Sequence, residues 1–267
     1  MNYYILLYHE LDSPDEKVPA GNAANLGLVV PAERFRQQLE CLAALNKPVV
    51  SLESILACPE PAPHQGEDRV VLTFDDGHRS AWSLALPALL QAGAVATFYV
   101  VSGRVDRKPK SLTSVQLRDL AANKMLIGSH GVTHRVLSEM DSRDLRCELA
   151  DSRARLEDIL GRPVLDLALP GGHFNRAVLE MAREVGYRSV ATCKVGIYRL
   201  GDDPLRLPRL EIRRRLSLEE YRRTFRPGKV LQLKALEAAK ACLRKTVGLS
   251  AYGRLRQLVH NFFPLNR

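Results

Sequence analysis

Short apolar runs, rich in β-branched and aromatic residues, recur along the chain and predict buried strands. Between them lie longer stretches in which apolar residues return every three or four positions, the spacing of one face of a helix. The predicted strands are residues 3–9, 49–51, 70–74, 94–101, 125–129, 164–168, 189–192 and 207–212. The predicted helices are residues 31–46, 80–91, 113–123, 141–160, 175–185 and 218–225. This alternation is typical of βαβ units around a parallel sheet and predicts an α/β fold.

Residues with capping chemistry stand at the ends of several predicted helices. Thr113 and Asp141 come at the start of two helices, where a side-chain oxygen can accept from the first backbone N–H groups. Ser217 and Glu220 have the spacing of a capping box. Gly186 follows another helix, at the position where glycine commonly ends one. Local chemistry and periodicity therefore agree on these helix boundaries.

The chain divides, by composition, into a body and a basic tail. Pro227-Gly228 is the predicted boundary between a barrel domain, residues 1–226, and a helical tail, residues 227–267. From Arg226 onward there are nine Lys and Arg residues and one acid, Glu237, so this part carries +8 of the formal net charge of +9. The body is almost neutral. This distribution argues against a protein that coats nucleic acid and favours a localised basic surface.

Cysteine usage and the N-terminal sequence indicate a reducing compartment. The five cysteines of the 267-residue chain are scattered, without a Cys-x-x-Cys pair, which argues against a disulfide framework and a cysteine zinc site. Residues 1–8 are apolar but lack a basic region before them, so we interpret them as a first strand and not as a signal peptide. No apolar run is long enough to span a membrane. We therefore predict a cytoplasmic protein, with the inner membrane face as a candidate contact.

Two adjacent carboxylates end an apolar, β-branched run that predicts a buried strand. The run 70–74 leads directly into Asp75, Asp76 and Gly77. In α/β proteins, chemistry collects where parallel strands end in loops at their carboxyl edge. Adjacent side chains diverge there, so one carboxylate could bind a metal while its neighbour handles a proton. An ordinary Asp-Asp-Gly surface turn is the alternative.

A second candidate group is the pair of histidines that follows the predicted strand 125–129. His130 and His134 are four residues apart, so one helical turn could bring both rings onto one face toward a metal. Two histidines at this spacing also occur by chance. Combined with a carboxylate from another strand end, they supply two nitrogens and one oxygen and leave a coordination position for water. That is the ligand set of an open, catalytic zinc-type centre.

These residues also carry a resemblance to a known family. The segments 73–77 (Thr-Phe-Asp-Asp-Gly) and 129–134 (Ser-His-Gly-Val-Thr-His) are similar to the first two motifs of the polysaccharide deacetylase superfamily, carbohydrate esterase family 4. Tyr8-His9-Glu10 resembles the first-strand element of many members. The resemblance covers roughly Ile5 to Phe225. It implies a distorted (β/α) barrel of about seven parallel strands, here with a C-terminal helical extension.

The resemblance implies a role for each motif residue. Asp76, His130 and His134 would bind the metal, and Asp75 would be the general base. Zinc is the first candidate, with cobalt, nickel and manganese as alternatives, because a site of this type binds several divalent ions. A backbone amide near Pro170–Gly172 would help to stabilise the oxyanion.

The chain departs from the family pattern in two places. The third motif usually has an arginine two residues before its proline, whereas this chain has Ala168-Leu169-Pro170-Gly171-Gly172. The later Leu-x-x-His motif, which supplies the general acid, is not evident, and Leu207-Pro208-Arg209-Leu210 stands roughly where a related strand would be. The candidate acids are then His9, His173, or Asp75 returning its own proton. A locally bonded histidine and an ordinary loop histidine are the alternatives for the first two.

The predicted function is that of a metal-dependent hydrolase that removes an acetyl, or a formyl, group from an amino sugar of a glycan or glycolipid precursor. The expected substrate is an N-acylated amino sugar, linked to a nucleotide or a lipid, because no export signal is evident. The alternatives are an inactive glycan- or membrane-binding module and a deacylase of a non-sugar amide. Nucleic acid is not an expected partner.

The tail has two interpretations. Its two helical stretches could pack their apolar faces on the barrel and leave a solvated basic side. Alternatively, basic residues beside Leu255, Leu258, Phe262 and Phe263 could dock on an anionic membrane surface.

Overall fold

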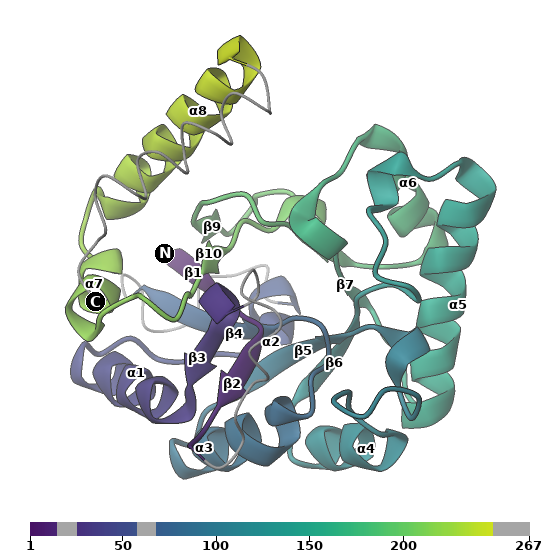
Figure 1. Cartoon of the computed structure of the whole chain (residues 1–267), viewed down its shortest axis with the longest axis horizontal. Helices are drawn as coiled ribbons and strands as arrows, with labels where there is room; N and C mark the ends of the chain where they lie inside the picture. Colours follow the sequence, from purple (N-terminus) through teal and green to yellow (C-terminus); the bar gives the residue numbers. More distant parts are fainter. Residues whose placement is uncertain (15–25, 58–67, 248–267) are drawn as a thin grey trace. The chain divides into compact units, whose positions relative to one another are not determined.

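The computed structural model describes residues 1–14, 26–57 and 68–247 (Figure 1). It divides into two compact units, Met1–Arg223 and Thr224–Arg267. The described part of the second unit contains the helix α8 (Lys229–Val247), as the spacing of apolar residues predicts. The second predicted helical stretch of the tail, residues 255–263, lies outside the described residues, and its contact with a membrane stays a prediction. None of the described helices combines the length and apolarity needed to cross a bilayer.

A curled, mostly parallel sheet forms the centre of the first unit. In spatial order its strands are β10 (Leu210–Glu211), β1 (Asn2–Tyr8), β4 (Arg69–Phe74), β5 (Ala96–Val100), β6 (Leu126–Ser129), β7 (Asp166–Ala168) and β8 (Ser189–Ala191). The short strand β9 (Tyr198–Arg199) pairs with β1 in the antiparallel direction. Strands β2 (Glu10–Asp12) and β3 (Val29–Pro31) form a separate parallel pair.

One short segment joins the two edges of this sheet. The Leu207 N–H donates to Val190 O and the Leu207 carbonyl accepts from the Thr192 N–H, both at 2.9 Å, so the segment bonds along β8. Three residues later, Leu210 pairs with Leu6 of β1. The sheet is therefore curled back on itself, and the predicted distorted (β/α) barrel is confirmed.

Helices surround the outside of the sheet in Figure 1. They are α1 (Ala32–Ala44), α2 (Leu52–Ala57), a π-helical turn (Ala81–Ala85) continued by α3 (Leu86–Gln91), α4 (Ser114–Ala122), α5 (Ser142–Leu160), α6 (Arg176–Val185) and α7 (Leu218–Thr224). The caps form as predicted: Thr113 makes a capping box with Gln116, and the Asp141 carboxylate accepts from the Asp144 N–H at 2.8 Å.

Some predicted elements differ from the structure. Residues 49–51 were expected to form a strand, but only Val49 makes an isolated bridge, to Val70. The predicted strand 207–212 is shorter, because its first half bonds to the neighbourhood of β8 and only β10 follows β1. The strands β2, β3 and β9 were not predicted, since two or three residues carry too little periodicity to be recognised. Most of the predicted loops 12–26 and 58–68 lie outside the described residues.

A stack of aromatic rings lies under the carboxyl ends of three neighbouring strands. Phe74 of β4 stacks on Tyr8 of β1 and on Phe98 of β5, with ring centroids 5.1 and 5.0 Å apart. Phe35 of α1 meets Phe74 edge-on at 5.5 Å. These buried rings pack at separations typical of attractive aromatic pairs. This packing holds the ends of β1 and β4, which His9 and Asp75 directly follow.

Candidate metal centre and active site

The two aspartates at the end of β4 point in different directions. Asp75 continues the strand with its side chain inside the barrel, where it is only 3% exposed. Asp76 and Gly77 then adopt left-handed backbone conformations, with φ of 72° and 67°. A Cβ on Gly77 would lie 2.9 Å from Val100 Cγ1, so this turn needs glycine. The turn brings the Asp76 carboxylate to the rim of the barrel while Asp75 stays below it.

The two histidines come together through a loop, and the predicted helical turn is wrong. Residues 130–134 have no helical structure, and both Gly131 and His134 have positive φ, 75° and 66°. The rings of His130 and His134 still lie 5.0 Å apart. Glu148 of α5 holds the loop by accepting hydrogen bonds from Thr133 N (2.6 Å) and Oγ1 (3.0 Å). Packing against α5 therefore replaces the helical spacing that the sequence suggested.

Asp76, His130 and His134 form a cluster with the geometry of metal ligands. One potential ligand atom from each residue lies within 4.8 Å of the other two. Asp76 Oδ1 is 2.9 Å from His134 Nε2 and 3.6 Å from His130 Nε2. Yet this oxygen is buried and has no well-directed hydrogen bond to any described residue. A buried acceptor that faces two imidazole nitrogens without a hydrogen bond is what a cation between them would satisfy, so these residues fit a divalent metal.

A carbonyl group sets the tautomer of His130. Its Nδ1 lies 2.8 Å from the Ala168 carbonyl oxygen, which can only accept, so Nδ1 carries the proton and Nε2 faces the cluster. Burial lowers the pKa of His130, and this effect outweighs the opposing influence of the Asp75 and Asp76 carboxylates. His130 is therefore a neutral imidazole whose free lone pair points to the proposed metal position.

Arg209 is a candidate site residue that the sequence did not reveal. Its guanidinium donates to both oxygens of Asp75, at 2.7 Å each, in a bidentate pair. The Arg209 side chain is fully buried and also donates to Thr192 O at 2.9 Å. A guanidinium from another part of the chain therefore pairs with Asp75, although no arginine stands before Pro170.

The charge of Asp75 follows from this pairing. Burial alone would raise the pKa of Asp75, but the Arg209 guanidinium and the His130 ring lower it to below its ordinary value. Burial likewise opposes ionisation of Asp76, and the His134 and His130 imidazoles outweigh it, so the pKa of Asp76 is also lowered. Both groups are carboxylates at neutral pH. Asp75 can then accept a proton, and Asp76 can bind a cation.

Replacing Arg209 with methionine should lower the free energy of unfolding by about 3–5 kcal/mol, because it leaves the Asp75 carboxylate buried without its partner. The double variant Asp75→Asn/Arg209→Met removes both charges and should recover much of that loss. Denaturant unfolding of metal-free wild type and both variants measures the two effects. Equal losses in the single and double variants would contradict a buried ion pair.

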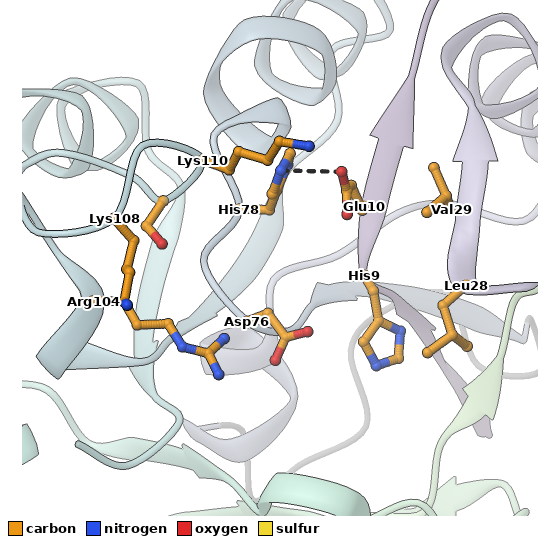
Figure 2. Close-up of a pocket in the computed structure, with 10 residues that line it drawn as sticks. His9, Glu10, Leu28, Val29, Asp76, His78, Arg104, Lys108 and Lys110 are labelled. Carbon is orange, nitrogen blue, oxygen red and sulfur yellow. Dashed lines mark ion pairs between the residues drawn. The ribbon is translucent and has the colours of Figure 1, made fainter. Parts of the chain in front are cut away.

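A cavity of about 410 Å³ opens beside Asp76 (Figure 2). His9 lines the same cavity, and its Nδ1 is buried without a hydrogen-bond partner among the described residues. His173, the other histidine proposed as an acid, is exposed and does not line this cavity. Of the two histidines, only His9 lines the cavity beside Asp76.

The turn Pro170–Gly172 is the predicted source of an oxyanion-stabilising amide. Pro170 has no N–H group, and the Gly172 N–H donates to Leu169 O at 2.8 Å. Gly171 therefore supplies the remaining candidate donor of this turn. A Cβ on Gly172 would overlap Cys193, so the turn packs tightly on the segment that follows β8.

Residues 62–190 match the polysaccharide deacetylase family. The chain is 26% identical over 194 residues to YxkH of Bacillus subtilis, an alignment that covers 72% of this chain and 64% of that protein. It is 30% identical over 125 residues to a peptidoglycan-N-acetylglucosamine deacetylase of Bacillus cereus, covering 46% of this chain and 56% of that protein. The matches thus span less than two thirds of the length of these curated relatives.

The fold is similar to that of solved deacetylase structures. The Streptococcus pyogenes deacetylase PplD, solved in complex with acetate, superposes with a TM-score of 0.76 and 26% sequence identity. That superposition covers 85% of this chain and 99% of the other. It therefore includes most of the barrel in which the cluster of Asp76, His130 and His134 lies.

Proposed function

This chain belongs to the polysaccharide deacetylase superfamily, and from that premise we propose that it is a metal-dependent hydrolase that removes the acetyl group from an N-acetylated amino sugar. A formyl group is the alternative acyl group. One observation carries the proposal: the ligand atoms of Asp76, His130 and His134 converge at the barrel rim beside a second, ionised carboxylate, Asp75. An inactive binding module would have no need of all four residues.

The donor set indicates which ion would bind. Two imidazole nitrogens and one carboxylate oxygen are typical of catalytic zinc sites, with cobalt, nickel and manganese as the other candidates. Such an ion supplies a Lewis acid for the acyl oxygen and makes a bound water more acidic. His130 and His134 would hold it through Nε2, and Asp76 through Oδ1.

Asp75 is the proposed general base. Its Oδ2 lies 3.9 Å from His130 Nε2, so it is beside the ligand cluster without belonging to it. The bidentate bond from Arg209 fixes the carboxylate plane. Asp75 can therefore take a proton from the attacking water in a defined orientation.

His9 is the proposed general acid. It lines the cavity beside Asp76 and has an unpartnered buried nitrogen in the described part of the chain. That nitrogen can give a proton to the leaving amine. The Gly171 N–H is the proposed backbone donor to the oxyanion.

Acetate release from N-acetylglucosamine oligomers tests this proposal. The zinc-loaded wild type should release acetate, and His9→Gln should lower kcat by about 10²–10⁴-fold through loss of the general acid. His173→Gln removes an exposed histidine of the same barrel and should stay close to wild type. No release of acetate from N-acetylated amino sugars, and no formate from N-formylated ones, would overturn the proposed function.

A further inference from the structure

The cavity beside Asp76 has two unlike sides (Figure 2). One side holds the Asp76 carboxylate and the His9 ring. The other holds three cationic side chains from the loop that follows β5, here called the basic wall: Arg104, Lys108 and Lys110. In Figure 2 the Arg104 guanidinium points toward the Asp76 carboxylate. The basic wall therefore faces the same space as Asp76, one of the three proposed metal ligands.

The loop that carries the basic wall is anchored to both metal-binding motifs. At its start, the Gly103 N–H donates to Val132 O at 3.1 Å, between the two histidine ligands. A Cβ at Gly103 would overlap that carbonyl oxygen, so this close approach needs glycine. At its end, the Lys110 carbonyl accepts from the Arg79 N–H at 2.7 Å, just after the turn of residues 75–77. The backbone thus fixes the position of these cations relative to the metal motifs.

The basic wall has no acidic partner in the described part of the chain. None of its three side chains forms an ion pair there. Asp106, the acid of the same loop, bonds to Ser114 instead. Glu10 also lines this cavity, and its Oε1 lies 3.0 Å from His78 Nε2. A divalent cation at Asp76 would add further positive charge to this space.

We infer that the basic wall binds a phosphate or pyrophosphate group carried by the N-acetylated sugar. A neutral sugar offers no anionic group that could pair with three cations lining one cavity. Phosphate matches them, because Arg binds it with a fork of N–H donors and Lys binds it as a point charge. The inference rests on the proposed function and narrows its substrate to a phosphorylated amino sugar, with a nucleotide or a lipid as the carrier.

A comparison of two small substrates tests the subsite. The zinc-loaded protein should use N-acetylglucosamine 1-phosphate with a kcat/KM about 10- to 100-fold above that for the neutral methyl glycoside. In Lys108→Gln/Lys110→Gln this ratio should fall close to one. The matched control Arg107→Gln/Lys124→Gln removes the same charge outside the cavity and should keep the preference. Equal ratios in the two double variants would overturn the inference.

A binding measurement separates this inference from the proposed function. Calorimetry on metal-free protein should show N-acetylglucosamine 1-phosphate binding that Lys108→Gln/Lys110→Gln weakens about tenfold and the control does not. Binding of this kind without any acetate release would support the subsite while the deacetylase proposal failed. Acetate release without a preference for the phosphorylated substrate would support the deacetylase proposal and overturn the phosphate subsite. Acetate release from UDP-N-acetylglucosamine and from a short polyprenyl pyrophosphate N-acetylglucosamine then identifies the carrier. If the protein used neither substrate, the assignment of a nucleotide or lipid carrier would be overturned.

Discussion

Replacing Asp76 with alanine should bring bound metal and acetate release down to background together. Asp76 supplies the only carboxylate of the ligand cluster in the described residues, and two imidazoles alone leave the ion short of the three protein ligands usual in catalytic sites. Because residue 76 has a φ of 72°, Asp76→Asn is the better-matched second variant, since asparagine tolerates this conformation. Elemental analysis and the acetate assay on the same samples measure both effects.

The matched control is Glu10→Ala. Glu10 is a carboxylate that lines the same cavity but does not belong to the ligand cluster, so its loss should leave about one metal ion per chain. His134→Ala should behave like Asp76→Ala, because it removes a second ligand. Wild-type metal content in both ligand variants would place the metal elsewhere and refute the assignment of this cluster.

The positions of the main strands and the main site residues could be predicted from local sequence. Periodicity located the strands β4 and β6, and the rule that chemistry collects at their carboxyl ends placed Asp75, Asp76, His130 and His134 together. The structure brings Asp76 and the two histidines to one point. Asp75, Asp76 and His130 lie within two residues of a strand end, and His134 is four residues beyond His130, so a local pattern was enough to find them.

The remaining features depend on contacts that no local pattern shows. His130 and His134 have a spacing compatible with both a helical turn and a loop, and only packing against Glu148 decides between them. Arg209 lies 134 residues from Asp75 in sequence, and the curled sheet brings them together. The local sequence shows only that Arg209 is a charged residue inside a predicted strand. A buried charge needs a partner, but the local sequence does not identify that partner.

Replacing Asp75 with asparagine should leave the metal in place and lower kcat by about 10²–10⁴-fold, the range for loss of a general base. Asparagine has nearly the shape of aspartate and keeps an oxygen that can accept from Arg209, but its amide cannot act as the base. Because Asp75 lies outside the three-ligand cluster, the metal content should not change. Steady-state kinetics and elemental analysis on one preparation measure both quantities.

The pH dependence follows from the lowered pKa of Asp75. Burial opposes ionisation of Asp75, but Arg209 and His130 outweigh this effect and lower its pKa. The proton-accepting carboxylate of Asp75 is therefore fully formed above the ordinary carboxyl range, and it is lost only as the pH falls below that range. We therefore expect no decline of wild-type kcat/KM from this group near neutral pH. A loss of activity between neutral pH and pH 5 that Asp75→Asn abolished would contradict the lowered pKa.

A second buried aspartate, Asp166, serves as a control that distinguishes the loss of a general base from the loss of a buried ion pair. Asp166 of β7 is 3% exposed, and Arg188 donates to its two oxygens at 3.0 and 2.9 Å, so its surroundings resemble those of Asp75. Asp166→Asn should lower stability and leave kcat near that of wild type, whereas Asp75→Asn should lower kcat in protein that remains folded. If Asp75→Asn instead lost the metal and Asp76→Asn kept it, the two adjacent aspartates would have exchanged roles. Asp76 would then be the remaining candidate for the base.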